Sequence, residues 1–368
     1  MPESAWNMMS TALKSSPPAS AGLPVPFARV LAGLLAGIGP VLPHRAALAE
    51  AKGGVLASPL VVPSPVPGKA IALRRGYAVR STDTLGAGPY SPLPLPAMPT
   101  LVEAGDVLPN GADAVLPEDA ILAMGGLAEA QESAAPGAWA RRIGEDAPAG
   151  TVLRGAGEVL RPLDIALAAA AGITHCEIRR PHLAVLGQDS AGPIARLLFE
   201  VARAAGASAS AGEIASSRPD LVIAIGPPAE WATMLGGRAV QPVADRLALR
   251  PGEDGMASLL GTIPVLVVPN RLADALGIWL ALARPVVAKL AGARDPARED
   301  RRLTRKISST IGISELVLLR RAGDSLEPLA TGDLPLQVMA AADAWTIIPP
   351  ESEGFAAGET VSAEFLVL

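Results

Sequence analysis

Strand-like and helix-like segments alternate over residues 181–293, and this alternation constrains the fold more than any other feature of the sequence. The run H-L-A-V-L (182–186) precedes P-I-A-R-L-L-F-E-V-A-R-A-A-G (193–206), which opens on a proline and closes on a glycine, as helices often do. Two more apolar runs follow, D-L-V-I-A-I-G (220–226) and I-P-V-L-V-V-P (263–269). Continuous apolar strands separated by helices predict a doubly wound parallel α/β domain, with a sheet covered on both faces.

The remainder of the chain predicts further domains, because 368 residues exceed the size at which one hydrophobic core stops growing. Helical and extended segments surround a stretch of short apolar runs rich in Gly and Pro, which predicts a small β-rich insert. Short strands separated by glycine turns predict a β-barrel-like domain at the end. The predicted boundaries are a disordered tail at 1–22, a helical and extended N-terminal domain at 23–87 plus 141–180, the insert at 88–140, the α/β domain at 181–293 and the C-terminal β domain at 294–368.

Composition excludes several classes of function. Aromatic residues make up only 3% of the chain and the net charge is -5, which argues against a nucleic-acid-binding surface. One cysteine and three histidines exclude a disulfide framework and a Cys-based zinc site. The sequence shows no signal-peptide pattern and no apolar run long enough to span a membrane, so we expect a cytoplasmic protein.

The stretch R-R-G-Y-A-V-R-S (74–81) places a rare tyrosine between arginines. Gly76 indicates a tight turn or a close backbone approach. Taken alone, the stretch is typical of a strand edge with a solvated basic flank. Arg74 and Arg75 would either bind an anion or pair with nearby carboxylates such as Asp83, and both alternatives are open.

Four other places carry candidate functional groups. Asp189 follows the first buried strand of the α/β domain, where open α/β sheets bind their ligands. Arg250, beside Pro251-Gly252, is either a phosphate contact or a solvated arginine. The acidic pair Glu145-Asp146 is either part of a site or a solvated loop, whereas Asp113 is expected to support a turn through its side-chain hydrogen bonds.

Two other groups are interpreted as structural. His175 and Cys176 lie in a strand-like segment after the glycine that ends a predicted helix, so a nucleophilic role is disfavoured. The large side chains of Trp231, Trp279 and Trp345 are isolated in the sequence, which is typical of packing.

Five phrases occur in an order that resembles the molybdopterin molybdenumtransferase family, which includes MoeA and the gephyrin E domain. The resemblance covers roughly residues 23–368. The first phrase is G-Y-A-V-R, which is similar to the end of the family's M-D-G-Y-A-V-R. The others are L-P-N-G-A-D-A-V-L-P-E-D (108–119), R-R-I-G-E-D-A-P-A-G-T-V-L (141–153), the helix-like L-R-P-L-D-I-A-L-A-A-A-A-G-I (160–173) and the closing I-I-P-P-E-S-E-G-F-A-A-G-E-T-V-S-A-E-F-L (347–366).

The resemblance implies a reaction and its requirements. Members of the family insert molybdenum, delivered as molybdate, into adenylylated molybdopterin and release AMP. This chemistry needs groups that hold phosphates and carboxylates that coordinate a cation such as magnesium. The resemblance also implies an elongated homodimer that meets other proteins of the molybdenum cofactor pathway, with no nucleic-acid or membrane partner.

The resemblance transfers roles to particular positions. It assigns catalysis to Asp146 and Asp189, while Arg75 occupies the position of a family aspartate, and it leaves the metal ligands unknown. It assigns substrate binding to a larger set that lies in several of the phrases: Gly76, Tyr77, Arg80, Glu145, Ser190, Arg250, Gly252 and Asn270.

Several family motifs are altered. Arg75 reverses the charge of the aspartate, and the family's threonine falls near Ala104. In G-Q-D-S, Asp189 stays but Ser190 replaces a glutamate. The glycine-rich loop reads A-I-G-P-P-A-E-W, whose prolines have no N–H to donate. The second lysine of the next motif is Glu253.

Three hypotheses follow. The first is an enzyme of molybdenum cofactor biosynthesis with reduced or altered catalysis. The second is a non-catalytic relative that binds molybdopterin or serves as a dimeric partner in molybdoenzyme maturation. The feature that discriminates between these two hypotheses is whether the altered loops still form a cationic pocket. The third, an unrelated activity in the same cleft, has no P-loop, nucleophile elbow or complete dinucleotide motif to support it.

Overall fold

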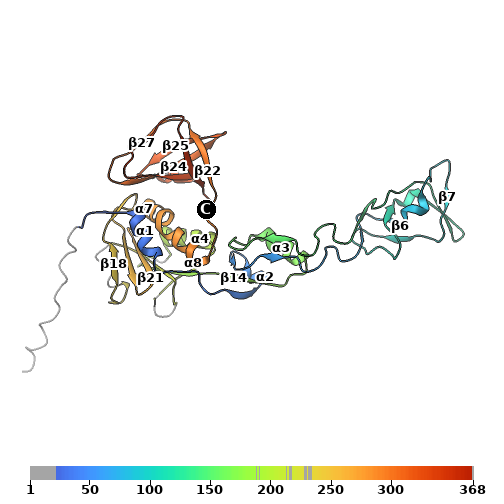
Figure 1. Ribbon diagram of the computed structural model, residues 1–368, viewed down its shortest axis with the longest axis horizontal. Coiled ribbons are helices and arrows are strands. Elements are labelled where there is room, and N and C mark those ends of the chain that lie inside the picture. Colours follow the sequence, from blue (N-terminus) through green and yellow to red (C-terminus); the bar gives the residue numbers. More distant parts are fainter. Residues whose placement is uncertain are drawn as a thin grey trace, which may run out of the picture.

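The computed structural model describes residues 22–366, apart from Gln188, Ser190, Glu213, 215–217, 228–229 and 231–233. The molecule is elongated (Figure 1). An α/β unit and a β-barrel lie at one end, a small β-rich unit lies at the other, and a third unit that contains α3 lies between them. No helix among the described residues is long and apolar enough to cross a membrane.

The α/β unit is built on a six-stranded sheet that is parallel only in part. Four strands are parallel, as predicted, but the fifth strand pairs antiparallel with both the fourth and the sixth, so the prediction of an all-parallel sheet is wrong there. The reason is local: the connection into the fourth parallel strand is a two-residue hairpin with Gly261 at φ 63°, which leaves no room for a crossover helix. In order, the strands are β16 (Ser208–Ala211), β15 (His182–Leu186), β17 (Leu221–Ile225), β21 (Ile263–Val268), β20 (Met256–Leu260) and β18 (Gln241–Ala244).

Helices from distant parts of the chain pack on one face of this sheet. Leu183, Ile223 and Leu266 on that face share a hydrophobic core with them. The opposite face packs on Ile214 and Leu235, among others. The helices of the first face are α1 (Phe27–Leu35), α4 (Pro193–Ala204), α7 (Leu272–Ile278) and α8 (Arg284–Ala291), with a π-helical turn, η3 (Trp279–Ala283), between the last two.

A closed five-stranded barrel follows, as the sequence predicts for the end of the chain. Closure comes from the pairing of β24 with both β25 and β26. Trp345 is buried beside the helices of the α/β unit, and Trp279 is buried too, which confirms both as packing residues; Trp231 is outside the described residues. The strands in order are β24 (Ser314–Ala322), β25 (Ser325–Thr331), β22 (Arg298–Leu303), β28 (Thr360–Phe365) and β26 (Ala344–Ile348), with β23 (Ile307–Ser308), β27 (Gly354–Phe355) and α9 (Leu336–Ala341) beside them.

Backbone pairing and an ion pair with a buried carboxylate join the barrel to the α/β unit. Strand β1 (Val25–Pro26) pairs with β19 (Leu247–Arg250), which pairs with β24 of the barrel. The guanidinium of Arg284, at the start of α8, contacts the carboxylate of Glu364 on β28. The Glu364 side chain is only 4% exposed, so its carboxylate is removed from water.

The middle unit contains the predicted helix over 160–173. It is α3 (Pro162–Ala170), and Gly172 at φ 76° follows its end. Cys176 lies in a strand, as expected, and burial, followed by the charge of Glu177, raises its pKa, which disfavours a nucleophilic thiolate. The other elements are β2 (His44–Ala47), α2 (Leu48–Ala51), β3 (Val55–Leu56), β14 (His175–Arg179), β4 (Leu60–Val61) and β13 (Val152–Arg154).

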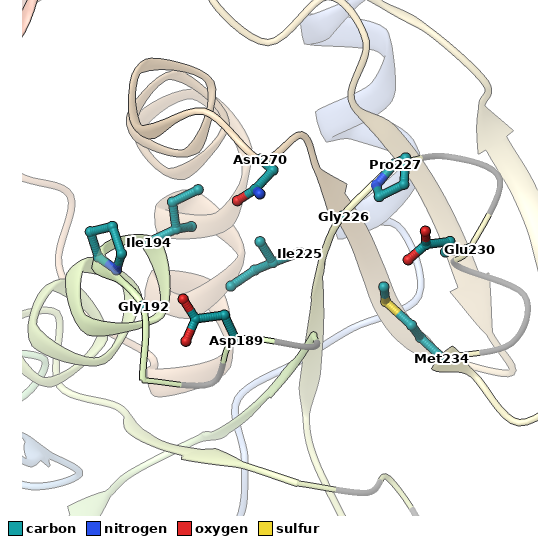
Figure 2. Close-up of a pocket in the computed structure, with 10 residues that line it drawn as sticks. Asp189, Gly192, Ile194, Ile225, Gly226, Pro227, Glu230, Met234 and Asn270 are labelled. Carbon is teal, nitrogen blue, oxygen red and sulfur yellow. The ribbon is translucent and has the colours of Figure 1, made fainter.

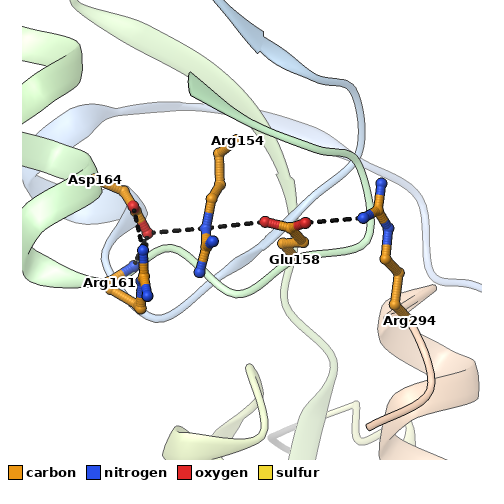
Figure 3. Close-up of polar contacts among 5 residues, drawn as sticks. All are labelled: Arg154, Glu158, Arg161, Asp164 and Arg294. Atoms are coloured by element: carbon orange, nitrogen blue, oxygen red, sulfur yellow. Dashed lines mark hydrogen bonds and ion pairs between the residues drawn. The ribbon is translucent and has the colours of Figure 1, made fainter. Parts of the chain in front are cut away.

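A polar chain fixes the middle unit to the end of α8 (Figure 3). Arg294 donates to Glu158 at 2.8 Å, and Arg154 lies 3.0 Å from Glu158 and 3.1 Å from Asp164. Asp164 also accepts the backbone N–H and the guanidinium of Arg161, so its carboxylate satisfies the N-cap residue at the start of α3. Burial raises the pKa of Asp164, but the bonds from Arg161 and the charge of Arg154 outweigh it, so the pKa of this carboxyl lies below its usual value.

In the Asp164→Asn variant, the free energy of unfolding is expected to fall less steeply than in wild type as the pH is lowered. Since the folded pKa is depressed, the carboxylate stabilises the fold above its unfolded pKa of about 3.9, and this contribution is lost as the pH falls through the folded pKa. At neutral pH the variant should lose about 1–2 kcal/mol. Urea unfolding at pH 7, 4 and 3 checks this, with Asp324→Asn, at a fully exposed side chain, as the control. Parallel pH profiles for wild type and Asp164→Asn would contradict the prediction.

The unit at the far end carries two small sheets and a two-stranded ladder. Asp113 accepts the backbone N–H and the hydroxyl of Ser81 at 2.7 and 2.8 Å, which confirms that it supports a turn. The elements are β5 (Ile71–Ala72), β6 (Gly76–Val79), η1 (Ser81–Thr84), β7 (Leu93–Pro94), β8 (Thr100–Val102), β9 (Ala114–Leu116), η2 (Glu118–Ala120), β10 (Ile121–Met124), β11 (Leu127–Ala130) and β12 (Ala140–Arg141).

We propose domain boundaries that differ from those expected. Strand β6 pairs with β8 and β9, and β5 pairs with β12, so the insert begins near residue 70 instead of 88. Residues 25–35 pack with the α/β unit, because Val30 and Leu34 are buried in its core. Both differences arise from pairings between segments far apart in the chain.

Gly76→Ala is expected to destabilise the insert by about 1–3 kcal/mol. A Cβ at this position would lie 2.2 Å from the carbonyl oxygen of Leu116, so the pairing of β6 with β9 requires glycine. Thermal unfolding together with limited proteolysis should show earlier cleavage within residues 70–142. Gly88→Ala is the matched control, since nothing lies within 4 Å of a Cβ there. Equal behaviour of the two variants would refute this account.

Candidate functional site

A pocket of about 250 Å³ opens at the carboxyl edge of the parallel strands (Figure 2). It lies just beyond the ends of β15, β17 and β21, the place where open α/β sheets bind ligands. Asp189 and Asn270, which the sequence predicts as site residues, both line it. The full lining is Asp189, Gly192, Pro193, Ile194, Ile225, Gly226, Pro227, Glu230, Met234 and Asn270.

The start of α4 holds Asp189 in place. A Cβ on Gly192 would lie 2.3 Å from a carboxylate oxygen of Asp189, so the glycine leaves the space that this carboxylate occupies. Gly192 is also the N-cap of α4 and, as a glycine, has no side chain to cap the helix. The first-turn N–H groups of Ile194 and Ala195 therefore have no intrahelical partner and face the pocket end of the helix. Such a helix start favours an anionic ligand group.

The charged side chains of the pocket are acidic. Asp189 and Glu230 contribute carboxylates, and none of the described lining residues is Lys, Arg or His. In Figure 2, Asp189 and Asn270 lie on one side of the Ile225–Gly226 backbone, and Glu230 and Met234 lie on the other. Among the described residues the altered loops do not form a cationic pocket around this site.

The oxygen donors of the pocket fit a magnesium ion better than a softer metal. Mg²⁺ is usually held by one or two carboxylates, with waters and substrate phosphates completing its shell. Asp189, Glu230 and the Asn270 amide supply hard oxygen ligands of this kind. The described residues contain no group of three or more His, Cys, Asp or Glu side chains that could hold a metal by themselves.

Arg250 and Gly252 do not line this pocket. Arg250 lies 3.2 Å from Glu253 and 3.6 Å from Glu315 of the barrel, so its charge is shared by two carboxylates. Gly252, at φ 120°, allows close packing on Ile278. Ser190, the remaining predicted residue of this region, is outside the described residues.

The arginines of R-R-G-Y-A-V-R-S are engaged within the insert. Arg75 pairs with Glu103 and Glu118 instead of Asp83, and its hydrogen bond lowers the pKa of Glu118. Arg74 stacks over Trp139, with 5.0 Å between the guanidinium carbon and the ring centroid. Tyr77 packs against the core of the insert.

Three other predicted residues have partners close to them in space. Arg80 donates to the carbonyl oxygen of Gly111 at 3.3 Å. Glu145 accepts the backbone N–H of Arg142 at 2.7 Å, and Asp146 lies 3.2 Å from Arg141. Within this chain, the structure thus brings Asp189 and Asn270 together, while Asp146 lies in a loop between the insert and the middle unit.

Sequence reasoning missed Glu230 and Met234. Both follow the end of β17, where the prolines of A-I-G-P-P-A-E-W predict a loss of N–H donors but give no sign of a carboxylate in the site. The signal that could have found Glu230 is its position in the sequence. It follows the buried strand β17, just as Asp189 follows the neighbouring strand β15.

The N-terminal part of the chain matches a known family model. Residues 25–172 match the model described as the MoeA N-terminal region (domain I and II). This range includes α1, the whole middle unit up to α3, and the insert.

Comparisons over most of the length agree with this match. The chain is 28% identical over 411 residues to molybdopterin molybdenumtransferase 1 of Mycobacterium tuberculosis, which covers 88% of this chain and 95% of that protein. It is 26% identical over 380 residues to molybdopterin molybdenumtransferase 2 of the same organism, covering 86% of this chain and 93% of that protein.

Solved structures share the fold. The crystal structure of a molybdopterin biosynthesis MoeA protein from Pyrococcus horikoshii OT3 matches with a TM-score of 0.68 at 21% identity. The match covers 93% of this chain and 100% of that chain.

Proposed function

Because the chain is a divergent member of the MoeA family, we propose that it acts in molybdenum cofactor biosynthesis as a molybdopterin molybdenumtransferase. The observation that carries this proposal is the pocket at the carboxyl edge of the parallel strands, where Asp189 and Asn270 meet beside the start of α4. The proposed substrates are adenylylated molybdopterin and molybdate.

The pocket suggests how the ligand is held. Backbone N–H groups at the start of α4 would donate to a phosphate oxygen, while Asp189 and Asn270 would hold a magnesium ion. The ion, when bound, would neutralise charge on the phosphoanhydride. Asp189 would orient the ion, and the apolar side chains of Ile194, Ile225 and Met234 line part of the pocket.

A non-catalytic binding or partner role is the second candidate, and particular contacts favour it. Arg75 replaces the family's aspartate and is paired with two glutamates, and Arg250 is shared between two others. Neither guanidinium lines the pocket. Such a relative would bind the pterin without releasing AMP.

Titration calorimetry separates the two candidates. The purified chain is titrated with molybdopterin and with its adenylylated form, with and without magnesium and molybdate, while AMP release is followed. Magnesium-dependent binding with AMP release supports the transferase. Binding without release supports the second candidate. Absence of binding to either pterin contradicts both.

We also propose that the chain is a homodimer that works with other proteins of the pathway. The family resemblance supports this, and sedimentation equilibrium tests it. A dimer mass over the working range of concentrations is expected, and a monomer mass at all concentrations would exclude it.

A further inference from the structure

A second pocket of about 250 Å³ lies in the insert. Its walls are small apolar side chains that belong to the core of this unit, among them Ala70, Leu108, Ala112 and Ala140. Drug-sized ligands use pockets of roughly 300–1,000 Å³, so this one suits a body of about one ring. The site proposed for molybdenum insertion shares none of these residues.

Three charged residues line the pocket, and two of them already have partners. Asp113 has both carboxylate oxygens engaged by Ser81, through the backbone N–H and the hydroxyl. Arg141 lies 3.2 Å from the carboxylate of Asp146. Both oxygens of Asp113 are therefore used by neutral donors in its turn, and the charge of Arg141 is partly balanced.

The third charged residue, Arg142, has unused donors. Its guanidinium makes one long bond, 3.4 Å, to the carbonyl oxygen of Pro136, and it pairs with no carboxylate among the described residues. Gly137 makes room for it: at φ 84°, a Cβ there would lie 3.0 Å from Nη2 of Arg142. The pocket thus joins an apolar floor to a guanidinium that has unused hydrogen-bond donors.

We propose that this pocket binds a small carboxylate with an apolar body. A guanidinium matches a carboxylate through two parallel hydrogen bonds, which favours this anion over a spherical one. The body of the ligand packs on Leu108, Ala112 and Ala140, and its carboxylate pairs with Arg142 at the rim. Occupancy would tie the turn at residues 136–137 to the loop that carries Glu145 and Asp146.

Benzoate is the probe for the test, applied to the full chain by calorimetry and by saturation-transfer NMR. Saturable binding of benzoate is expected, at least tenfold tighter than that of benzamide, which lacks the charge, and of acetate, which lacks the ring. Arg142→Gln should weaken benzoate binding at least tenfold. Arg203→Gln, which removes a charge from the exposed side of α4, should leave it unchanged.

Ala112→Leu checks the location independently, since the larger side chain fills the pocket. It should abolish benzoate binding, and an unchanged melting temperature would show that the insert stays folded. Failure of wild type to bind benzoate saturably would overturn the proposal, as would equal binding by wild type and Arg142→Gln. Tighter binding of inorganic phosphate than of benzoate would also overturn it, because it would show a general anion site.

Discussion

Replacing Arg284 by methionine is expected to destabilise the protein by about 3–5 kcal/mol. The change leaves the carboxylate of Glu364 without its partner at the junction of the barrel and the α/β unit, where its side chain is only 4% exposed. A buried, unpaired carboxylate costs far more than the loss of an exposed ion pair. Urea unfolding followed by tryptophan fluorescence measures the effect, since Trp345 is buried at the same junction.

A double-mutant cycle separates the lost ion pair from lost packing. Glu364→Leu should cost less than Arg284→Met, because Arg284 is 25% exposed and can reach water when its partner is removed. The double variant, Arg284→Met with Glu364→Leu, should recover most of the stability. If the two single losses simply add in the double variant, the ion pair is not the cause.

Asp189→Ala is expected to weaken magnesium-dependent binding of adenylylated molybdopterin on the order of a hundredfold, about 2.7 kcal/mol at 1.36 kcal/mol per factor of ten. Asp189 is one of the two carboxylates of the pocket, and it lies beside the start of α4. Any AMP release should fall in proportion. Because Asp189 is exposed, the melting temperature should not change.

Two comparisons make this test specific. Asp189→Asn keeps the shape but removes the charge, so it should lose the dependence on magnesium as fully as Asp189→Ala does. Glu200→Gln, on an exposed turn of the same helix, should behave like wild type. Binding by Asp189→Ala that still rises with magnesium would exclude Asp189 as a ligand of the ion.

The parts of the fold that could be predicted from sequence are those with a strong local pattern. The expected strand at 182–186 is β15, and the expected helix at 193–206 is α4 (Pro193–Ala204). The hairpin of β20 and β21 was missed although its Gly261-Thr262 turn lies between two apolar runs, a recognised hairpin signal. The pairing of β1 with β19 has no local signal, since two residues pair with a strand more than two hundred positions away.

The residues of the candidate site also fall into two groups, those that the sequence predicts and those whose contacts depend on the pairing of distant strands. Asp189 could be predicted because it follows a buried strand, whereas Asn270 was predicted only through the family resemblance. That they share a pocket depends on the order of strands, in which β17 lies between β15 and β21. The partners of Arg75 could not be found locally either: Glu103 and Glu118 come from segments that the pairing of β6 with β8 and β9 brings near it.

The packing of α1 on the α/β unit has a consequence for the order in which the chain acquires its structure on the ribosome. Val30 and Leu34 are buried in a core that also contains α8, so this core cannot form before α8, which ends at Ala291, has been made. The insert and the middle unit, both encoded between these segments, emerge earlier and have cores of their own. They can therefore fold first. During this time the apolar side chains of α1 stay exposed, because the segment they pack against is synthesised some 250 residues later. A chaperone could bind this apolar segment until then.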